Sequence, residues 1–114
     1  MNKRTITFLL SIFLIIKHSN SQTVTVYKYQ FSKIDSLKCF YKNDRPDKQI
    51  FYYKSGRVQS EIYFDKNGEK KSLEYYENGN KRCETIRKDS RGYKHKITEW
   101  DENENKTSSG VYIE

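Results

Sequence analysis

One ten-residue stretch decides the fold. It reads Tyr52-Tyr53-Lys54-Ser55-Gly56-Arg57-Val58-Gln59-Ser60-Glu61. Two aromatic residues are followed by a short polar segment ending in glycine, which is typical of a tight turn. Polar and less polar residues alternate after the turn, and this period of two is typical of a β-strand. The stretch therefore predicts the end of one strand, a hairpin turn and the beginning of the next strand.

The same pattern recurs along the chain. The predicted turn glycines are 12, 11 and 13 residues apart, at Gly56, Gly68, Gly79 and Gly92. Aromatic residues precede the turns and basic residues follow them. Asn67-Gly68 and Asn78-Gly79 are dipeptides that favour the type I′ turn of a two-residue hairpin. Each unit then holds a strand of about eight residues and a turn of about four, within the usual range of strand lengths.

These repeats predict an all-β protein, an elongated single antiparallel β-meander of repeated hairpins. The predicted strands are residues 22–31, 37–43, 48–54, 57–65, 69–77, 81–88, 93–100 and 106–113. Residues 22–114 contain no apolar stripe with helical spacing, and the chain has no alanine. Aliphatic residues are few, so the ten tyrosines and one tryptophan must supply much of a thin core.

The first 21 residues have the order of a secretory signal peptide. Lys3 and Arg4 precede the apolar run 6–16, and small residues lie at Ser19 and Ser21. The sequence predicts a signal peptide helix over residues 1–21, cleaved after Ser21, and one repeat domain over residues 22–114. An uncleaved membrane anchor is less favoured, because eleven apolar residues are short of the roughly 20 needed to span a bilayer. The expected location is secreted or periplasmic.

The units resemble a known family. Residues 52–61 look like the Tyr-Tyr-x-Asn-Gly-Lys-Leu-x-Ser-Glu unit of MORN-repeat-variant proteins, and residues 75–84 match it with Lys81 in place of Leu. Residues 63–74 and 100–106 look like degenerate copies, the last with Glu104 in place of glycine. The resemblance covers about 40–106 and implies stacked β-hairpins. Many bacterial members are called YwqK-type antitoxins, so it also implies an antitoxin-like or immunity role.

Residues suited to catalysis or cofactor binding are scarce. His95 is the one histidine outside the predicted signal peptide, and no phosphate-binding glycine loop is present. The acidic stretch 101–105 begins like a calcium loop, but Lys106 and Tyr112 replace its essential Gly and Glu. We therefore predict no enzyme, no metal site and no cofactor. Acidic residues are interspersed among the basic ones, so nucleic acid is not the expected partner either.

The two cysteines are predicted to be free thiols. Cys39 falls on the second predicted strand and Cys83 on the sixth. Four strand steps of about 4.8 Å separate them by roughly 19 Å, whereas a disulfide needs Cα atoms within about 7 Å. A sheet that curls on itself would be the exception.

The sequence favours a non-catalytic exported repeat protein that acts as a protein-binding or scaffold module. The candidate binding residues are aromatic, because tyrosine and tryptophan dominate protein interfaces: Tyr53, Tyr63, Tyr76, Tyr93 and Trp100. Two alternatives stay open, binding to a glycan or anionic lipid of the cell envelope and inhibition of an exported toxin. The edge strands near 22–31 and 107–113 could also pair with a second copy.

Overall fold

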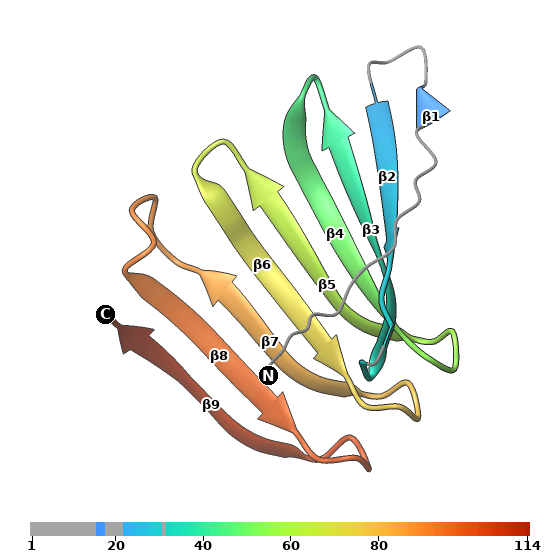
Figure 1. The fold of residues 1–114 in the computed structure, drawn as a ribbon. Helices are drawn as coiled ribbons and strands as arrows, with labels where there is room; N and C mark the ends of the chain where they lie inside the picture. Colours follow the sequence, from blue (N-terminus) through green and yellow to red (C-terminus); the bar gives the residue numbers. More distant parts are fainter. Residues whose placement is uncertain (1–15, 18–21, 31) are drawn as a thin grey trace, which may run out of the picture.

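The computed structural model of the protein describes residues 16–17, 22–30 and 32–114. They form one antiparallel sheet in which the strands follow one another in sequence order, β1 to β9. The strands are β1 (Ile16–Lys17), β2 (Gln22–Lys28), β3 (Ile34–Lys42), β4 (Arg45–Tyr53), β5 (Val58–Asp65), β6 (Gly68–Tyr75), β7 (Lys81–Arg87), β8 (Lys94–Trp100) and β9 (Lys106–Ile113). Figure 1 shows an open, twisted and curved sheet.

The predicted all-β antiparallel meander is confirmed. Each of the eight predicted strands overlaps one of β2 to β9. The predicted signal peptide helix lies outside the described residues, apart from the two residues of β1, which pair with β2. Among the described residues, no helix is long and apolar enough to cross a membrane.

Successive turns lie at alternate ends of the sheet. The turns after β4, β6 and β8 share one end, which we call the Gly79 end, and those after β3, β5 and β7 share the other, the Gly68 end (Figure 1). The sequence period of about twelve residues is therefore one strand, whereas the repeat in space is two strands. Residues 23 to 25 positions apart are the ones that occupy equivalent places.

The turns at the Gly79 end share one hydrogen-bonding pattern. In the first, the amide of Gly56 donates to the carbonyl of Tyr53 at 2.9 Å, and Gly79 donates to Tyr76 in the same way at 2.9 Å. In the third turn Glu104 takes the glycine position and donates to Asp101 at 3.1 Å. Each of these residues has a positive φ, with Glu104 at 72°. This is a turn followed by one left-handed residue, a common hairpin loop of three residues.

The predicted type I′ turns at Asn67-Gly68 and Asn78-Gly79 are wrong. Among the described non-glycine residues, only Asn43, Asp44 and Glu104 have positive φ, so in both dipeptides the glycine alone is left-handed. The two-residue type I′ turn occurs instead at Asn43-Asp44, where Lys42 pairs with Arg45. A type I′ turn needs positive φ at both central residues, and Asn and Asp tolerate it better than other non-glycine residues.

Replacing Glu104 by Gly is expected to stabilise the fold. A non-glycine residue in the left-handed region costs about 1 kcal/mol, and Gly56 and Gly79 occupy the equivalent place without that cost. Urea unfolding of E104G should show a higher free energy of unfolding than the native chain. As a control, Glu102→Gly makes the same substitution in the same turn at a residue without positive φ. It should not raise the free energy of unfolding.

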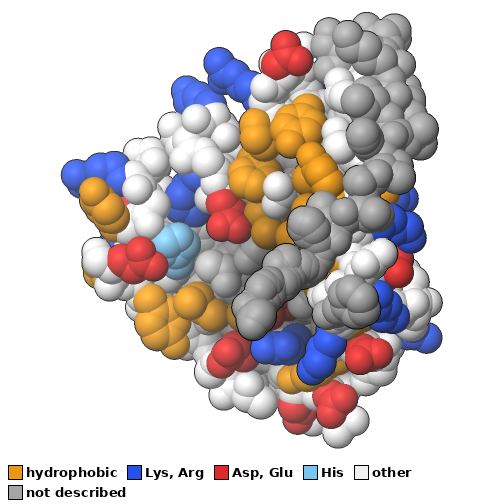
Figure 2. All heavy atoms as spheres, in the orientation of Figure 1, with side chains coloured by type: hydrophobic (Ala, Val, Ile, Leu, Met, Phe, Trp, Pro, Cys, Tyr) orange, Lys and Arg blue, Asp and Glu red, His pale blue; other side chains and the backbone are white. Residues whose placement is uncertain are grey.

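Burial is shallow on both faces of the sheet. The most buried side chains of the described residues are Leu37, Cys39 and Ser60 on one face, and Ser36, Leu73 and Thr98 on the other, each at 4 to 9% exposure. Figure 2 shows the sheet from the side seen in Figure 1, with hydrophobic side chains gathered in its upper centre and charged ones around them. The core is therefore thin, as the composition predicts.

Strand bulges interrupt the simple alternation expected along β5. A register shift between Phe51 and Tyr52 leaves Gln59 of β5 without a partner, so Val58 does not share the face of Ser60 and Ile62. A second shift, between Tyr63 and Phe64, leaves out Lys70 of β6, so Phe64 stays on the face of Ile62. Equivalent shifts recur where β7 and β9 begin. Bulges of this kind increase local twist.

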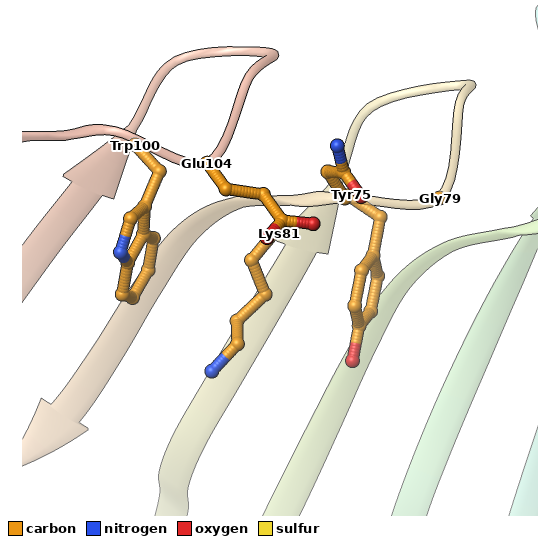
Figure 3. Close-up of a pocket in the computed structure, with 6 residues that line it drawn as sticks. Tyr75, Gly79, Lys81, Trp100 and Glu104 are labelled. Atoms are coloured by element: carbon orange, nitrogen blue, oxygen red, sulfur yellow. The ribbon is translucent and has the colours of Figure 1, made fainter.

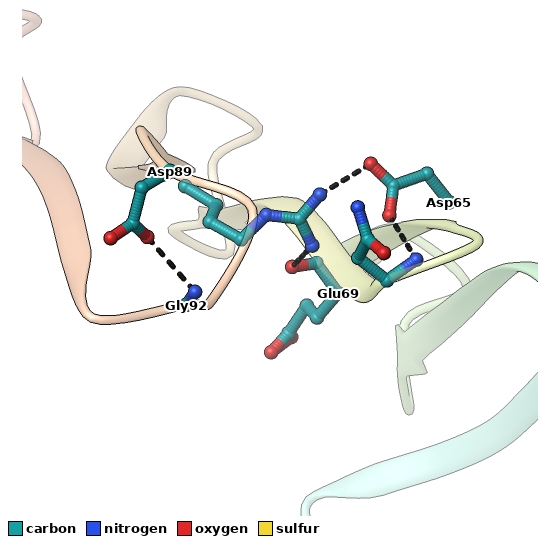
Figure 4. A network of polar contacts seen from close by, with 6 residues as sticks. Asp65, Glu69, Asp89 and Gly92 are labelled. Carbon is teal, nitrogen blue, oxygen red and sulfur yellow. Dashed lines mark hydrogen bonds and ion pairs between the residues drawn. The ribbon is translucent and has the colours of Figure 1, made fainter.

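Polar contacts stabilise the loops after β5 and β7 at the Gly68 end (Figure 4). Arg87 forms an ion pair with Asp65 and donates from Nη1 to the carbonyl of Glu69 at 2.9 Å. The amide of Asn67 and the guanidinium of Arg87 lower the pKa of Asp65. Burial opposes ionisation of Asp89, but the amides that it accepts, including that of Gly92 at 2.9 Å, outweigh it and lower its pKa.

The cysteines lie on the same face with three strands between them. Cys39 is on β3 and Cys83 on β7, and both are free thiols. Burial raises the pKa of each, so both stay protonated at neutral pH.

Candidate binding face

One face of the sheet carries a row of lysines on alternate strands. The register places Lys48 of β4, Lys71 of β6 and Lys96 of β8 on a single line across the sheet. The residues between them on this line are Tyr63 and Ile86, from β5 and β7. Alternate strands are about 9.6 Å apart, so the three lysine positions repeat along the sheet at roughly 10 Å. We call this row the lysine row.

A second row on the same face is aromatic. Tyr52, Tyr75 and Trp100 each lie four residues after a member of the lysine row on the same strand. Side chains four apart on a strand share a face and lie about 13 Å apart. The aromatic row therefore runs parallel to the lysine row at the Gly79 end. The spatial unit is one lysine and one aromatic residue on each of β4, β6 and β8.

Further lysines make this face strongly basic, and we call it the basic face. The register adds Lys28, Lys38, Lys81 and Lys106 to it. Its strand centres contribute two acids, and both have partners: Glu61 accepts from Tyr75 Oη at 2.8 Å, and Glu84 lies 3.7 Å from Lys71 Nζ. Positive charge therefore outweighs negative charge on this face.

Several of these lysines lie over aromatic rings. The Nζ atom of Lys48 is 4.9 Å from the centroid of the Phe40 ring, and that of Lys38 is 5.3 Å from Tyr52. Each contact is worth about 0.5–1 kcal/mol at an exposed site. Lys38 and Lys48 are both half-buried residues, so each packs its side chain against the sheet beside a ring.

A slot lies in the aromatic row between β6 and β8 (Figure 3). It is a cavity of about 380 Å³ lined by Tyr75, Gly79, Asn80, Lys81, Trp100 and Glu104. Figure 3 shows Tyr75 and Trp100 at its two sides with Lys81 between them, all extending in the same direction along the sheet. Lys81 Nζ is 5.0 Å from the centroid of the Trp100 ring. We call this cavity the aromatic slot.

The two sides of the slot are held differently. Burial and the hydrogen bond to Glu61 raise the pKa of Tyr75 well above its usual range, so its hydroxyl is fixed as a donor. On the other side, the Trp100 carbonyl accepts a hydrogen bond from Tyr76 Oη at 2.8 Å. The walls of the slot are therefore positioned by contacts that do not occupy the cavity.

Tyr53 and Tyr76 connect neighbouring hairpins. Tyr53 Oη donates to the carbonyl of Tyr75 at 2.6 Å, and Tyr76 makes the equivalent bond to Trp100 one unit further on. Polar side chains reinforce the link, since Arg57 Nη1 donates to the carbonyl of Asn78 at 2.8 Å. The sequence singled out both tyrosines as binding residues, whereas the structure places them in half-buried contacts between turns.

The other predicted binding residues are dispersed. Tyr63 lies within the basic face on β5, and Tyr93 lies at the Gly68 end and is 52% exposed. Of the five predicted residues, Trp100 alone lines the aromatic slot. The five therefore do not form one row.

Sequence reasoning missed the lysine row and two members of the aromatic row. Their signal is the pattern Lys-x-x-x-aromatic, present in Lys48–Tyr52, Lys71–Tyr75 and Lys96–Trp100. Its spacing of 23 and 25 residues is twice the strand period, so it emerges only if every second strand is compared.

The structure offers little for metal chemistry. In the part of the chain that is described, no group of three His, Cys, Asp or Glu side chains is placed to hold a metal ion. The carboxylate of Asp101 accepts the amides of Asn103 and Asn105, each at 2.9 Å. These hydrogen bonds lower the pKa of Asp101, and those from Asn105 lower it most. They also close the turn. His95 pairs in register with Arg87 and Tyr112, on the opposite side of the sheet from the basic face.

No family model and no curated protein matches the chain, so the resemblance to MORN-repeat variants stays a prediction. The sheet is similar to part of TarM from S. aureus. A mutant of TarM, crystallised in complex with Fondaparinux, alpha-GlcNAc-glycerol and UDP, aligns with a TM-score of 0.50 and 12% identity. The alignment spans 84% of this chain and 21% of the TarM chain. A second crystal structure of TarM gives a TM-score of 0.47 at 12% identity, with the same coverage of 84% and 21%. At this identity the likeness concerns the fold alone.

Proposed function

We propose that the chain is a non-catalytic binding module that works outside the cytoplasm and holds an acidic partner on its basic face. The observation that carries the proposal is the repeated pair of one lysine and one aromatic residue on β4, β6 and β8. Packing of a sheet requires apolar side chains but does not require lysines at a fixed interval. A surface that repeats charge and ring together is suited to an extended partner.

The envelope is the setting that the predicted signal peptide implies. Acidic polymers and anionic lipid headgroups are abundant there, and lysines near an anionic surface contribute about 1 kcal/mol each. A scaffold for an acidic protein is the alternative within the same proposal. In both cases the partner contacts the face and not the thin core.

The test is retention by the envelope fraction of the source cells, measured by co-sedimentation at low and high salt. The variant Lys48→Gln/Lys71→Gln/Lys96→Gln is expected to lose most of its retention. Its matched control removes three positive charges elsewhere, by Lys33→Gln/Lys66→Gln/Lys88→Gln, and should be retained like the native chain. Equal losses in the two variants would mean that net charge, not the basic face, mediates binding, and would overturn the proposal.

A further inference from the structure

The aromatic row can bind a ligand by stacking against its rings as well as by charge. The slot volume of about 380 Å³ lies in the range of small-molecule sites, which is about 300–1,000 Å³. Two aromatic rings form its sides and one ammonium group lies between them. Flat apolar surfaces with one cation suit a ring that has an apolar face and an acidic substituent.

The cation of the slot is available to a ligand. Lys81 contacts the Trp100 ring, and none of the ion pairs within 4.0 Å among the described residues involves it. Glu104 lines the rim of the same cavity. One carboxylate beside one ammonium disfavours a ligand of high charge density, such as polyphosphate, because the like charges repel. A ligand with about one negative charge per ring fits better.

The row repeats beyond the slot. Tyr52, at the end of β4, continues it on one side, with Lys38 Nζ 5.3 Å from its ring. Lys106, paired with Trp100 in register, continues it on the other side. The rings recur at roughly 10 Å, twice the strand spacing. A polymer of linked hexose rings that lies across the strands can meet each ring in turn.

We propose that the aromatic row binds an extended acidic polysaccharide, with sugar rings stacked on Trp100 and Tyr75 and a carboxylate of the polymer held by Lys81. This inference rests on the proposed function and specifies its partner. A peptide strand fits the row less well, because the backbone groups of the interior strands β4 to β8 are already paired on both sides. A polysaccharide needs only the side chains.

The single tryptophan gives a direct readout, because all indole fluorescence of the chain comes from the slot. The probes are oligogalacturonates of increasing length. We expect a saturable change in Trp100 emission, with affinity rising until the oligomer spans Tyr52 to Trp100, roughly 20 Å or four strand steps, and no further rise beyond. Neutral malto-oligosaccharides of the same lengths should bind at least about tenfold more weakly, since each lost ion pair costs up to about 1 kcal/mol.

Two variants and one control separate the contributions of ring and charge. Lys81→Gln should weaken oligogalacturonate binding about fivefold, which corresponds to about 1 kcal/mol. Trp100→Ala, followed by calorimetry, should weaken it at least tenfold, by analogy with the stacking of flat rings on aromatic side chains. Lys66→Gln, at the Gly68 end, should bind like the native chain. Circular dichroism of each variant confirms that the sheet is intact.

The outcomes distinguish the two proposals. If oligogalacturonates cause no saturable emission change but the envelope fraction still retains the chain through the lysine row, the polysaccharide inference is wrong and the binding module stands. Tighter binding of phosphatidylglycerol vesicles, single-stranded DNA or polyglutamate, with the same dependence on Trp100, would also overturn the inference. Loss of both oligogalacturonate binding and envelope retention would remove both proposals.

Discussion

Replacing Leu73 by Ala is expected to lower the free energy of unfolding by about 2–3 kcal/mol. Leu73 lies in the middle of β6 and is 9% exposed, one of the two leucines among the most buried side chains of the described residues. It is flanked in register by Glu61 and Glu84 on the basic face. The expected loss lies at the lower end of the range for buried leucines, because a single sheet can collapse around the gap.

The measurement is urea unfolding followed by far-ultraviolet circular dichroism. Val111→Ala is the matched control, because Val111 is also an apolar strand residue on the basic face but is 56% exposed. It should change the stability by no more than about 0.5 kcal/mol. Equal effects of the two substitutions would mean that the layer around Leu73 does not stabilise the sheet, contrary to the burial pattern.

The second large effect is expected from removing two hydroxyl groups. Tyr53→Phe and Tyr76→Phe each delete one hydrogen bond to a carbonyl of the next hairpin, at 2.6 and 2.8 Å. Each should cost about 1 kcal/mol, and the double variant about 2 kcal/mol. The aromatic rings remain, so any loss reports the hydrogen bonds and not the packing.

Tyr93→Phe provides the control for the hydroxyl deletions. Tyr93 is 52% exposed, and the hydrogen bonds found among the described residues do not involve its hydroxyl. Its stability should therefore stay close to that of the native chain. A double-mutant cycle also tests independence, since Tyr53 bonds the carbonyl directly before Tyr76. If both single substitutions are neutral, the connection between hairpins does not stabilise the fold.

Local sequence patterns were sufficient to predict the strands. Period-two alternation and glycine spacing are properties of a few neighbouring residues, so β2 to β9 follow from them closely. The turn types were harder to predict from the sequence, because Asn-Gly is compatible with both a type I′ turn and a loop with one left-handed residue. The bulges after the turns at the Gly79 end select the second, and these bulges depend on pairing between strands.

The candidate site was predictable only in part. Trp100 is a predicted binding residue and lines the slot, whereas the sequence singles out Tyr76 and not its neighbour Tyr75, which lines the slot. Which of two adjacent tyrosines faces the slot depends on the register of the whole strand, and a shift of one residue exchanges the faces. The roles of Tyr53 and Tyr76 depend on contacts about 22 to 24 residues away, which no local pattern encodes.

The hydroxyl bonds of Tyr53 and Tyr76 have a consequence for how the sheet folds. In a meander, each strand normally makes stabilising contacts only with the strand before and the strand after it. Such arrays can therefore unfold progressively from one end. Tyr53 links β4 to β6, and Tyr76, directly after β6, links the end of that strand to β8, so each bond skips one strand. These second-neighbour couplings penalise partly ordered states in which one hairpin is formed and the next is not. The central strands should therefore order as one cooperative unit, with β4 to β8 as the last part of the sheet to exchange its amide hydrogens.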